Sequence, residues 1–498
     1  MEQSFVLLVP ILLPVLAGVI LLCGRSFLER VQEWYTAAVL LVNGIIVVAL
    51  CYFGGTGDGL KLKLFELVPG ISIVFHLDSL GMFFGVFASL IWLVVGFYSF
   101  AYMKNEEHQT RFYGFYLIVI GVLVGIYQSG SLITMYVFYE LMTITSLPLV
   151  LHEQNHEAII AGLKYLFYSF FGAFLALAGI LVLNAYGMDF TFIPGGSGAE
   201  ILAGNKTMFL VVLGMMLVGF GVKAGLFPFQ GWLPTAHPVA PAPASGVLSG
   251  VIAKSGVFAI IRVIYYLFGA DFMVGSWVQK VFLTLTLITV LMGSVLAFWE
   301  KNFKKRLAYS TVSQVSYILF GIGLLNPTAL TGSLLHVLCH GLIKNGLFLT
   351  AGICLVVYGY RSVDELSGIG KKMPWAIGGY TVLSLGLTGI PPFGGFLSKW
   401  YLAEGALGSG LSIFRWLGPV VLLISAVLTA GYLIPITAKG FFAGETGAGK
   451  KGREADYKRE ISPLLAVPIL IFAVLIVFIG LFPDSLVEFF YTMASGLM

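Results

Sequence analysis

Two stretches of the chain decide its fold, and they are similar to each other: Lys223-Ala-Gly-Leu-Phe-Pro228-Phe-Gln-Gly231 and Gly389-Ile-Pro391-Pro392-Phe-Gly-Gly395-Phe-Leu-Ser-Lys399. Each interrupts a long apolar segment with glycine and proline, and each keeps a lysine beside the interruption. Proline inside a helix removes a backbone donor and clashes with the preceding turn, so we expect broken helices at these positions. Broken hydrophobic segments in corresponding positions of two halves indicate an ion pathway at the interface between repeats.

The composition of the chain is that of an integral membrane protein. Hydrophobic residues make up 58% and charged residues only 10%, against roughly 25% charged residues in soluble domains. The mean hydropathy is +0.96. The lipid bilayer is therefore the expected surrounding, and no nucleic-acid partner is expected. The four cysteines are scattered without a C-x-x-C pair, which argues against an iron–sulfur cluster, so we expect no cofactor or metal in this chain.

Apolar runs long enough to cross a bilayer, about 20 residues each, occur fourteen times. We therefore predict an all-α polytopic membrane protein with about fourteen transmembrane helices. The predicted spans are 5–23, 35–53, 80–101, 112–128, 131–150, 160–184, 208–230, 240–267, 278–299, 308–325, 330–358, 376–409, 417–440 and 463–482.

The offset between the two interrupted stretches predicts an internal repeat. Gly225 and Gly389 are 164 positions apart, which fits two five-helix units at 112–267 and 278–440. Because five is odd, the second unit must be inverted relative to the first, an arrangement found in many transporters. Helices one to three would flank the pair within 1–111, and a cytoplasmic loop and helix fourteen would follow within 441–498.

The lysines and arginines predict the orientation in the membrane. If the N-terminus lies outside, 17 of the 28 fall in inward loops and 5 in outward loops. The positive-inside rule then places both termini on the non-cytoplasmic side of the cell membrane. The other six lie within the apolar runs: Lys164, Lys223, Lys254, Arg262, Lys344 and Lys399. Lys164 and Arg262 are expected to extend toward the membrane surface.

One carboxylate lies deep in an apolar run. Glu140 is about ten residues from either end of the run 131–150, where an acid must be neutral or paired with a cation. Lys223, just before the first break, is the expected partner. Intramembrane lysines with an available carboxylate mark ion relays, so we predict a switchable proton site. Asp78, at the start of helix three, is expected to be a helix N-cap instead.

Three further ionisable residues share one helix face. His336, His340 and Lys344 are spaced at i, i+4 and i+8, so they form a stripe about 12 Å long. Histidine titrates near neutrality, which favours a proton relay over simple packing. Lys254 lies about three turns into a helix expected to begin after Pro243.

A rival interpretation comes from His152-Glu-Gln-Asn-His156, which matches the H-E-x-x-H zinc motif. That would make the chain an intramembrane zinc metalloprotease. A third ligand is also needed, and only His336 and His340 follow deep in a span. We therefore favour a polar turn between helices five and six.

Taken together, these segments resemble the antiporter-like subunit family. It includes proton-pumping membrane-arm subunits of complex I, Mrp-type sodium/proton antiporter subunits and membrane-bound hydrogenase subunits. The resemblance rests on Phe138-Tyr-Glu140-Leu-Met, Lys223 to Pro228, Trp232-Leu-Pro-Thr-Ala-His237, Ala240-Pro-Ala-Pro-Ala-Ser245 through Lys254, Lys304-Lys-Arg-Leu-Ala-Tyr-Ser310, His340-Gly-Leu-Ile-Lys344 and Gly389 through Lys399.

The resemblance implies fourteen helices with inverted five-helix repeats and breaks in helices seven and twelve. It makes Glu140 and Lys223 the charge pair of one half-channel and Lys399 the terminal site of the other. Lys254, with His336 and His340, would link them, and any redox centre would belong to other chains. The expected partners are paralogous antiporter-like subunits, small membrane subunits and a peripheral iron–sulfur or hydrogenase module.

Among the family's subtypes, the chain looks closest to the Mrp D-type subunit or to a hydrogenase- or ferredoxin-linked relative. Two features point there: the chain ends soon after helix fourteen, and Lys399 stands where one complex I paralogue carries glutamate. The smallest antiporter-like paralogue of complex I is also compatible. The expected function is proton translocation within a redox-driven complex, with Mrp-type sodium/proton antiport as the alternative.

Overall fold

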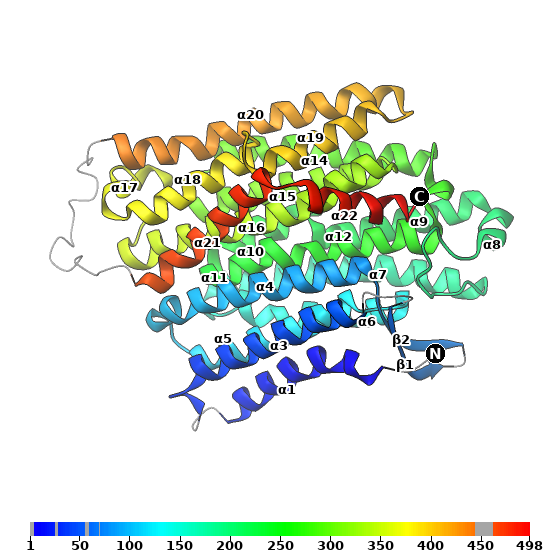
Figure 1. The fold of residues 1–498 in the computed structure, drawn as a ribbon, viewed down its shortest axis with the longest axis horizontal. Helices are drawn as coiled ribbons and strands as arrows, with labels where there is room; N and C mark the ends of the chain where they lie inside the picture. The colour runs from blue at the N-terminus through cyan, green and yellow to red at the C-terminus, as the bar shows by residue number, and fades with distance from the viewer. Residues whose placement is uncertain (1–3, 25–27, 55–58, 69, 444–461) are drawn as a thin grey trace.

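The computed structural model is a bundle of long helices and describes residues 4–24, 28–54, 59–68, 70–443 and 462–498 (Figure 1). Within these ranges, twelve helices are long and apolar enough to cross a membrane. They are η1 with α1 (Phe5–Cys23), α3 (Gln32–Gly54), α4 (Ser79–Tyr102), α5 (Gln109–Tyr127), α6 (Leu132–Val150), α7 (His156–Ala185), α9 (Lys206–Ala224), the run from α11 to η5 (Ala242–Phe268), α14 (Trp277–Trp299), α16 (Pro327–Tyr358), α20 (Ser412–Phe442) and α21 (Pro463–Leu481).

The two other predicted spans, 308–325 and 376–409, correspond to a more polar helix and to a pair of short helices. α15 (Phe303–Gly323) has 21 residues and packs between α14 and α16, but it carries many hydroxyl and amide side chains. The predicted span 376–409 is two helices of 15 and 14 residues, α18 (Pro374–Thr388) and α19 (Gly394–Leu407), each too short to cross alone. The polytopic helical architecture is confirmed, whereas the inverted repeat and the 112–267 and 278–440 boundaries stay predictions.

A two-stranded hairpin, which the all-α prediction missed, joins α3 to α4. β1 (Leu60–Val68) pairs antiparallel with β2 (Ile71–Leu77), in a register that sets Leu60 opposite Leu77. The run Leu60-Lys-Leu-Lys-Leu alternates apolar and charged residues with period two, which is the strand signal. The search for long apolar runs passed over it because the strand has nine residues and three of them, Lys61, Lys63 and Glu66, are charged.

Short elements complete the described chain. They are η2 (Met103–Asn105), α8 (Ala199–Gly204), η3 (Gln230–Trp232), α10 (Leu233–Val239), α13 (Ala270–Met273), η6 (Val363–Glu365), α17 (Ile369–Lys372) and α22 (Asp484–Ser495). The run from α11 to η5 consists of α11 (Ala242–Val247), the π-helical turn η4 (Leu248–Ile252), α12 (Ala253–Ile261) and the π-helical turn η5 (Arg262–Phe268).

The α11–η5 run is the centre of the bundle, since every one of its residues is buried. Its neighbours approach closely where it carries glycine. A Cβ on Gly256 would lie 2.7 Å from the carbonyl oxygen of Phe220 on α9, and a Cβ on Gly250 would collide with the Asn345 side chain on α16. Because Gly256 and Gly250 have no side chains, α9 and α16 can pack directly against the run that carries Lys254.

The N and C marks lie at the same end of the bundle, and the N mark lies beside the β1–β2 hairpin (Figure 1). At the opposite end, the loops that follow α14 and α16 meet the last turn of α20. Asn302 bridges to Ser362, and Lys301 and Lys439 lie 3.3 and 3.5 Å from the carboxylate of Asp364. The hydrogen bond from Lys301 lowers the pKa of Asp364. These loops belong to the predicted inward set; Arg25 and most of the predicted loop at 443–460 lie outside the described residues.

Candidate functional site

The first break is a turn in which neighbouring side chains satisfy the backbone. α9 ends at Ala224, and Gly225 adopts φ 79°, a left-handed conformation suited to glycine. The indole nitrogen of Trp232 donates to the carbonyl of Val222 at 2.9 Å. The backbone N–H of Phe227 donates to the Thr289 hydroxyl at 3.0 Å. The predicted break at Pro228 is present, and Trp232 and Thr289 bond to its backbone without help from Lys223.

Lys223 points from the last turn of α9 toward α6. Its side chain is 1% exposed, and its ammonium nitrogen donates to the Thr143 hydroxyl at 2.6 Å. The same nitrogen lies 4.5 Å from the centre of the Tyr139 ring, where a cation is attracted to the aromatic face. Thr143 is therefore a site residue that the sequence analysis missed.

Glu140 lies on α6, three residues before Thr143. One of its carboxylate oxygens is buried and has no hydrogen-bond partner in the described part of the chain. Lys223 is the cation whose charge acts on it, although these two side chains form no ion pair within 4.0 Å. Glu140 and Lys223 are thus brought to one place, with Lys223 bonded to the hydroxyl beside the carboxylate.

Lys254 contacts a histidine at the centre of the bundle. Its nitrogen lies 2.6 Å from Nδ1 of His340 and donates to the carbonyl of Ser249 at 2.5 Å. That carbonyl belongs to η4, where the π-helical turn alters the helical hydrogen bonds. Because an ammonium has only donors, a charged Lys254 requires a neutral His340 with Nδ1 as acceptor.

The row continues along α16 to α19. The rings of His340 and His336 are stacked with centres 5.9 Å apart, and Nδ1 of His336 lies 2.8 Å from the Ser398 hydroxyl. Nε2 of each histidine is buried without a hydrogen-bond partner among the described residues. Both histidines of the predicted stripe therefore belong to one row of side chains, which begins at Lys254 and reaches Ser398 on α19.

Lys399 bonds to the second break. α18 ends at Thr388, Gly389 adopts φ 91°, and α19 begins at Gly394. The Lys399 nitrogen donates to the carbonyls of Leu387 and Thr388 at 2.6 and 3.0 Å. The predicted break at Pro391 and Pro392 is thus present, and Lys399 binds carbonyls at the end of α18.

Tyr317 joins Lys399 to the histidine row. The Lys399 nitrogen lies 5.2 Å from the centre of the Tyr317 ring, and that ring stacks on His336 with centres 5.5 Å apart. Lys399 also follows Ser398 directly in the chain. It is therefore at the end of the row that begins at Lys254.

Lys344 joins the row through backbone and hydroxyl groups. Its nitrogen donates to the carbonyl of Leu307 on α15 at 3.0 Å, and the Thr311 hydroxyl donates to the same carbonyl at 2.9 Å. Thr311 in turn lies 2.7 Å from the hydroxyl of Ser249. Lys344 is therefore linked to the Lys254 site from the α15 side, through the Leu307 carbonyl and Thr311.

A buried hydroxyl network on α14, α15 and α20 escaped the sequence analysis. The hydroxyl of Ser294 lies 2.8 Å from that of Ser313 and 2.6 Å from that of Ser425. Nearby, the Ser310 hydroxyl lies 2.6 Å from that of Tyr432. The signal was the run Ser310-Thr-Val-Ser-Gln-Val-Ser inside a predicted span, where so many hydroxyl groups are unusual.

Two minor expectations have definite outcomes, and a third, for Lys164, stays a prediction. Asp78 is an N-cap, as predicted, and accepts from the N–H of Gly81 at 2.9 Å. The expectation that Arg262 extends to the surface is wrong: it is 1% exposed and pairs with Asp78 through two contacts of 2.5 and 2.7 Å. Lys164 donates to the Thr235 hydroxyl at 3.1 Å.

The zinc-motif histidines occupy a turn. His152 lies between α6 and α7, and His156 is the first residue of α7, so the two do not share the helix face that the motif requires. His152 is buried, and burial beside the Arg111 guanidinium lowers its pKa to about 4. Over the described ranges, no three His, Cys, Asp or Glu side chains are grouped as a metal site.

Comparison with protein families identifies two matching regions. Residues 129–437 match the family described as "NADH:quinone oxidoreductase/Mrp antiporter, TM". Residues 69–113 match "NADH-Ubiquinone oxidoreductase (complex I), chain 5 N-terminus". The first region contains Glu140, Lys223, Lys254, His336, His340, Lys344 and Lys399.

Three relatives match most of this chain. The NADH-quinone oxidoreductase subunit N of Desulforudis audaxviator is 29% identical, over 96% of this chain and 97% of the relative. Hydrogenase-4 component B of Escherichia coli is 29% identical, over 91% and 69%. The D-type subunit of the Na(+)/H(+) antiporter of Bacillus subtilis is 27% identical, over 89% and 88%.

Two solved structures share the fold. A chain of the Mrp complex from Dietzia sp. superposes with a TM-score of 0.84 and 25% identity, over 99% of this chain and 97% of that one. A chain of an archaeal membrane-bound sulfane sulfur reductase superposes with a TM-score of 0.86 and 22% identity, over 99% and 98%.

Proposed function

Because the chain belongs to the antiporter-like membrane subunit family shared by NADH:quinone oxidoreductases and Mrp antiporters, we propose that it translocates protons as part of a redox-driven complex. Members of this family are ion-translocating membrane subunits of multisubunit complexes. Two statements are proposals for this chain: that the ion is a proton, and that a redox reaction drives its movement.

The observation that carries the proposal is the row from Lys254 to Lys399. It runs through His340, His336 and Ser398 and crosses from α12 through α16 to α19. The two terminal nitrogens belong to lysines, and the two rings between them can each accept a proton on one nitrogen and release it from the other. Ionisable groups inside a membrane are costly, so a connected row of them indicates a pathway.

A proton can move along this row without covalent chemistry. Lys254 can give a proton to Nδ1 of His340, which then releases one from Nε2. The next step, to His336, spans rings whose centres are 5.9 Å apart, so it requires a bridging water or a ring rotation. From His336 the proton can pass to the Ser398 hydroxyl. Ser398 makes no hydrogen bond to Lys399, so the last step to Lys399 also requires a bridging water. Each transfer returns the preceding group to its neutral state.

The Glu140–Lys223 site is proposed as the switch. Lys223 is bonded to Thr143, with the Glu140 carboxylate one turn away on the same helix. A carboxylate stabilises a charged ammonium more strongly than a hydroxyl does. Movement of the Lys223 nitrogen between these two partners would therefore change how strongly it retains its proton. We propose that this change couples the Glu140–Lys223 site to the row from Lys254 to Lys399.

The proposed assembly follows from the relatives. The family members named above include a subunit of an NADH-quinone oxidoreductase and a hydrogenase component. We propose that paralogous and small membrane subunits surround this chain and that a peripheral iron–sulfur or hydrogenase module supplies the electrons. In this arrangement the loops joined at Asp364 face the cytoplasm and both termini face outward, with inverted units at 112–267 and 278–440.

The second candidate is Mrp-type sodium/proton antiport. It is favoured by the antiporter relative from Bacillus subtilis, 88% of which is matched, and by the superposition on the Mrp complex. Both candidates use the same row of groups. They differ in the partners present and in whether sodium drives the proton flux.

The test uses the intact complex purified from native membranes through a tag on this chain. Mass spectrometry identifies the partners, and proteoliposomes with an entrapped pH dye are energised by the electron donor that those partners imply or by a sodium gradient. We expect iron–sulfur partners and acidification driven by the donor. Proton movement driven only by sodium would support antiport, and a Lys254→Ala complex that assembles and pumps normally would contradict proton translocation through this chain.

A further inference from the structure

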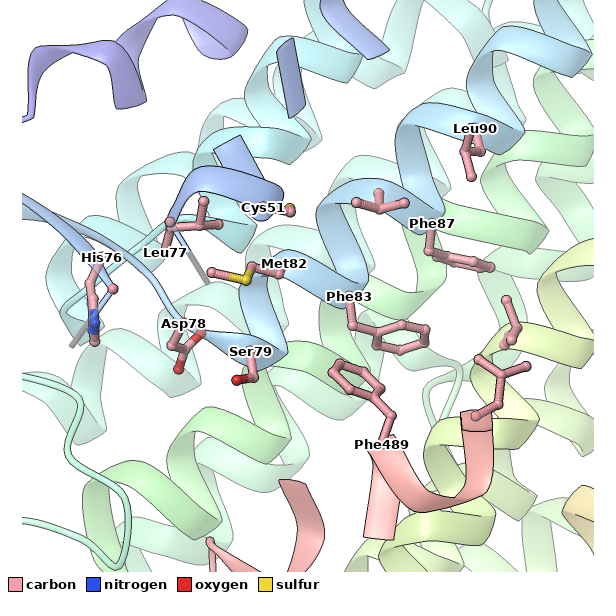
Figure 2. A pocket seen from close by; sticks show the side chains of 15 residues that line it. Cys51, His76, Leu77, Asp78, Ser79, Met82, Phe83, Phe87, Leu90 and Phe489 are labelled. Carbon is pink, nitrogen blue, oxygen red and sulfur yellow. The ribbon is translucent and has the colours of Figure 1, made fainter. Parts of the chain in front are cut away.

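A cavity of about 720 Å³ lies between α3, α4, α16 and α22, on the side of the bundle where the β1–β2 hairpin joins α4 (Figure 2). Its lining changes from polar to apolar. His76, Asp78 and Ser79 lie at the hairpin side, and the opposite wall ends at Leu90 on α4. Phe83 of α4 faces Phe489 of α22 across the space (Figure 2).

The position of the polar side chains matches a membrane boundary. Ser79 is the first residue of the membrane-crossing helix α4, and the lining continues down that helix through Met82 and Val86 to Leu90. Eleven residues of α-helix rise about 17 Å, a little more than half the hydrocarbon thickness of a bilayer. The polar end therefore lies at headgroup level, and the apolar end lies in the hydrocarbon region.

The lining selects the occupant. Polar side chains lie at the hairpin end of the cavity, and the rest of the wall, over about 17 Å of α4, is apolar. A phospholipid has the same order of polar and apolar parts. Water is disfavoured because the lining below Ser79 is apolar. A hydrocarbon chain is apolar and is the surrounding medium.

We propose that this cavity binds a membrane phospholipid, with one acyl chain along α4 and the headgroup at Ser79 and Asp78. Asp78 is already paired with Arg262, so its charge is neutralised. The headgroup therefore meets this ion pair and the Ser79 hydroxyl, which favours binding of the headgroup through hydrogen bonds over binding through its net charge.

The walls of the cavity belong to the elements that hold the proton row. Leu338 on α16 lies between His336 and His340 in sequence, and the Phe87 ring would collide with a Cβ on Gly341. At the other end, Asp78 holds Arg262, which follows Lys254 on the same central run. The two histidines are already buried by the protein, so a bound acyl chain would act on the row by supporting α16 and the Asp78–Arg262 pair. Any effect on proton movement rests on the proposed function, whereas the binding site does not.

The test is photo-crosslinking of the intact complex in nanodiscs of phosphatidylethanolamine and phosphatidylglycerol, with a trace phospholipid that carries a diazirine midway along one acyl chain. Crosslinked peptides are mapped by mass spectrometry. We expect labelling at Met82, Val86 and Leu90 at least fivefold above that of the lipid-facing surface of α20. Equal labelling of both surfaces in the unmodified complex would overturn the proposal, whether or not protons are pumped.

Substitutions then test the cavity itself. Val86→Trp should fill it and reduce labelling at Met82 and Leu90 at least fivefold. The matched control Val427→Trp, on an exposed position of α20, should leave this labelling unchanged. Three results contradict the proposal: labelling unaffected by Val86→Trp, a partner-subunit peptide crosslinked in place of lipid, or displacement of the probe by an isoprenoid quinone at lower concentration than by unlabelled phospholipid. Loss of pumping with normal labelling would overturn only the proposed function.

Discussion

The two helix breaks use similar sequences for different purposes. At the first, Trp232 caps the Val222 carbonyl, so Lys223 is left to bond the side chain of Thr143. At the second, Lys399 itself binds the carbonyls of Leu387 and Thr388. A lysine bonded to a side chain can exchange partners when that side chain moves. A lysine bonded to two carbonyls at a helix end also holds the backbone together.

Because of this difference, we expect the two lysines to contribute differently to transport and to stability. Lys223 precedes its break and is on the rigid helix, whereas Lys399 follows its break and reaches back across it. Substitution at Lys223 should therefore affect proton movement alone. Substitution at Lys399 should affect both proton movement and the stability of the break, because freed carbonyls in a membrane interior require donors.

The largest expected effect is that of Lys223→Ala and Glu140→Ala on transport. Each should reduce donor-driven proton pumping at least tenfold, because each removes one partner of the switch. The double variant should be hardly worse than either single variant, since residues that act as one unit are not additive. Initial rates of dye acidification in proteoliposomes provide the measurement. Additive losses of pumping in the double variant would show that the two residues act independently and would contradict the switch.

Lys399→Leu should come next, and it should lower both pumping and thermal stability. It leaves two carbonyls without their donor, and a buried unsatisfied polar group costs about 1–3 kcal/mol. Lys399→Gln, which keeps an N–H donor but cannot release a proton, should restore much of the melting temperature without restoring pumping. Full pumping by Lys399→Gln would make this lysine purely structural.

A smaller effect is expected from Trp232→Phe at the first break. The ring remains, but the hydrogen bond to the Val222 carbonyl is lost, so stability should fall by about 1–3 kcal/mol. The melting temperature of the detergent-solubilised complex is the readout. Pumping per folded complex should stay within twofold of wild type; a tenfold loss would mean that Trp232 belongs to the transport machinery.

The smallest effect is expected from Thr143→Val, a change of similar shape that removes the hydroxyl bonded to Lys223. With Glu140 still one turn away, Lys223 should shift to the carboxylate and pumping should fall about two- to fivefold. Thr145→Val is the matched control, because Thr145 lies on the same helix and bonds a carbonyl of its own helix. Equal effects of the two variants would contradict a specific role for Thr143.

The sequence predicted the features that depend on local spacing. Glycine and proline identified both breaks, and the i, i+4 spacing placed His336 and His340 on one face. It did not predict the partners of the long side chains. Thr143 and the carbonyl of Thr388 are reached by flexible lysines across a helix gap or a turn, and such contacts are set by packing. The Ser294–Ser313–Ser425 network joins three helices and was likewise invisible to a search for long apolar runs.

The most direct test of the proton row is the pumping rate of a complex that carries His340→Asn. Asparagine is polar and similar in size but cannot take up and release a proton, and His340 contacts Lys254 at 2.6 Å. His156→Asn is the matched control, because His156 is exposed in a turn at the start of α7. The row predicts at least a tenfold loss of dye acidification for His340→Asn and none for His156→Asn, in complexes that assemble equally. Unchanged acidification by the His340→Asn complex would contradict the row as the proton pathway.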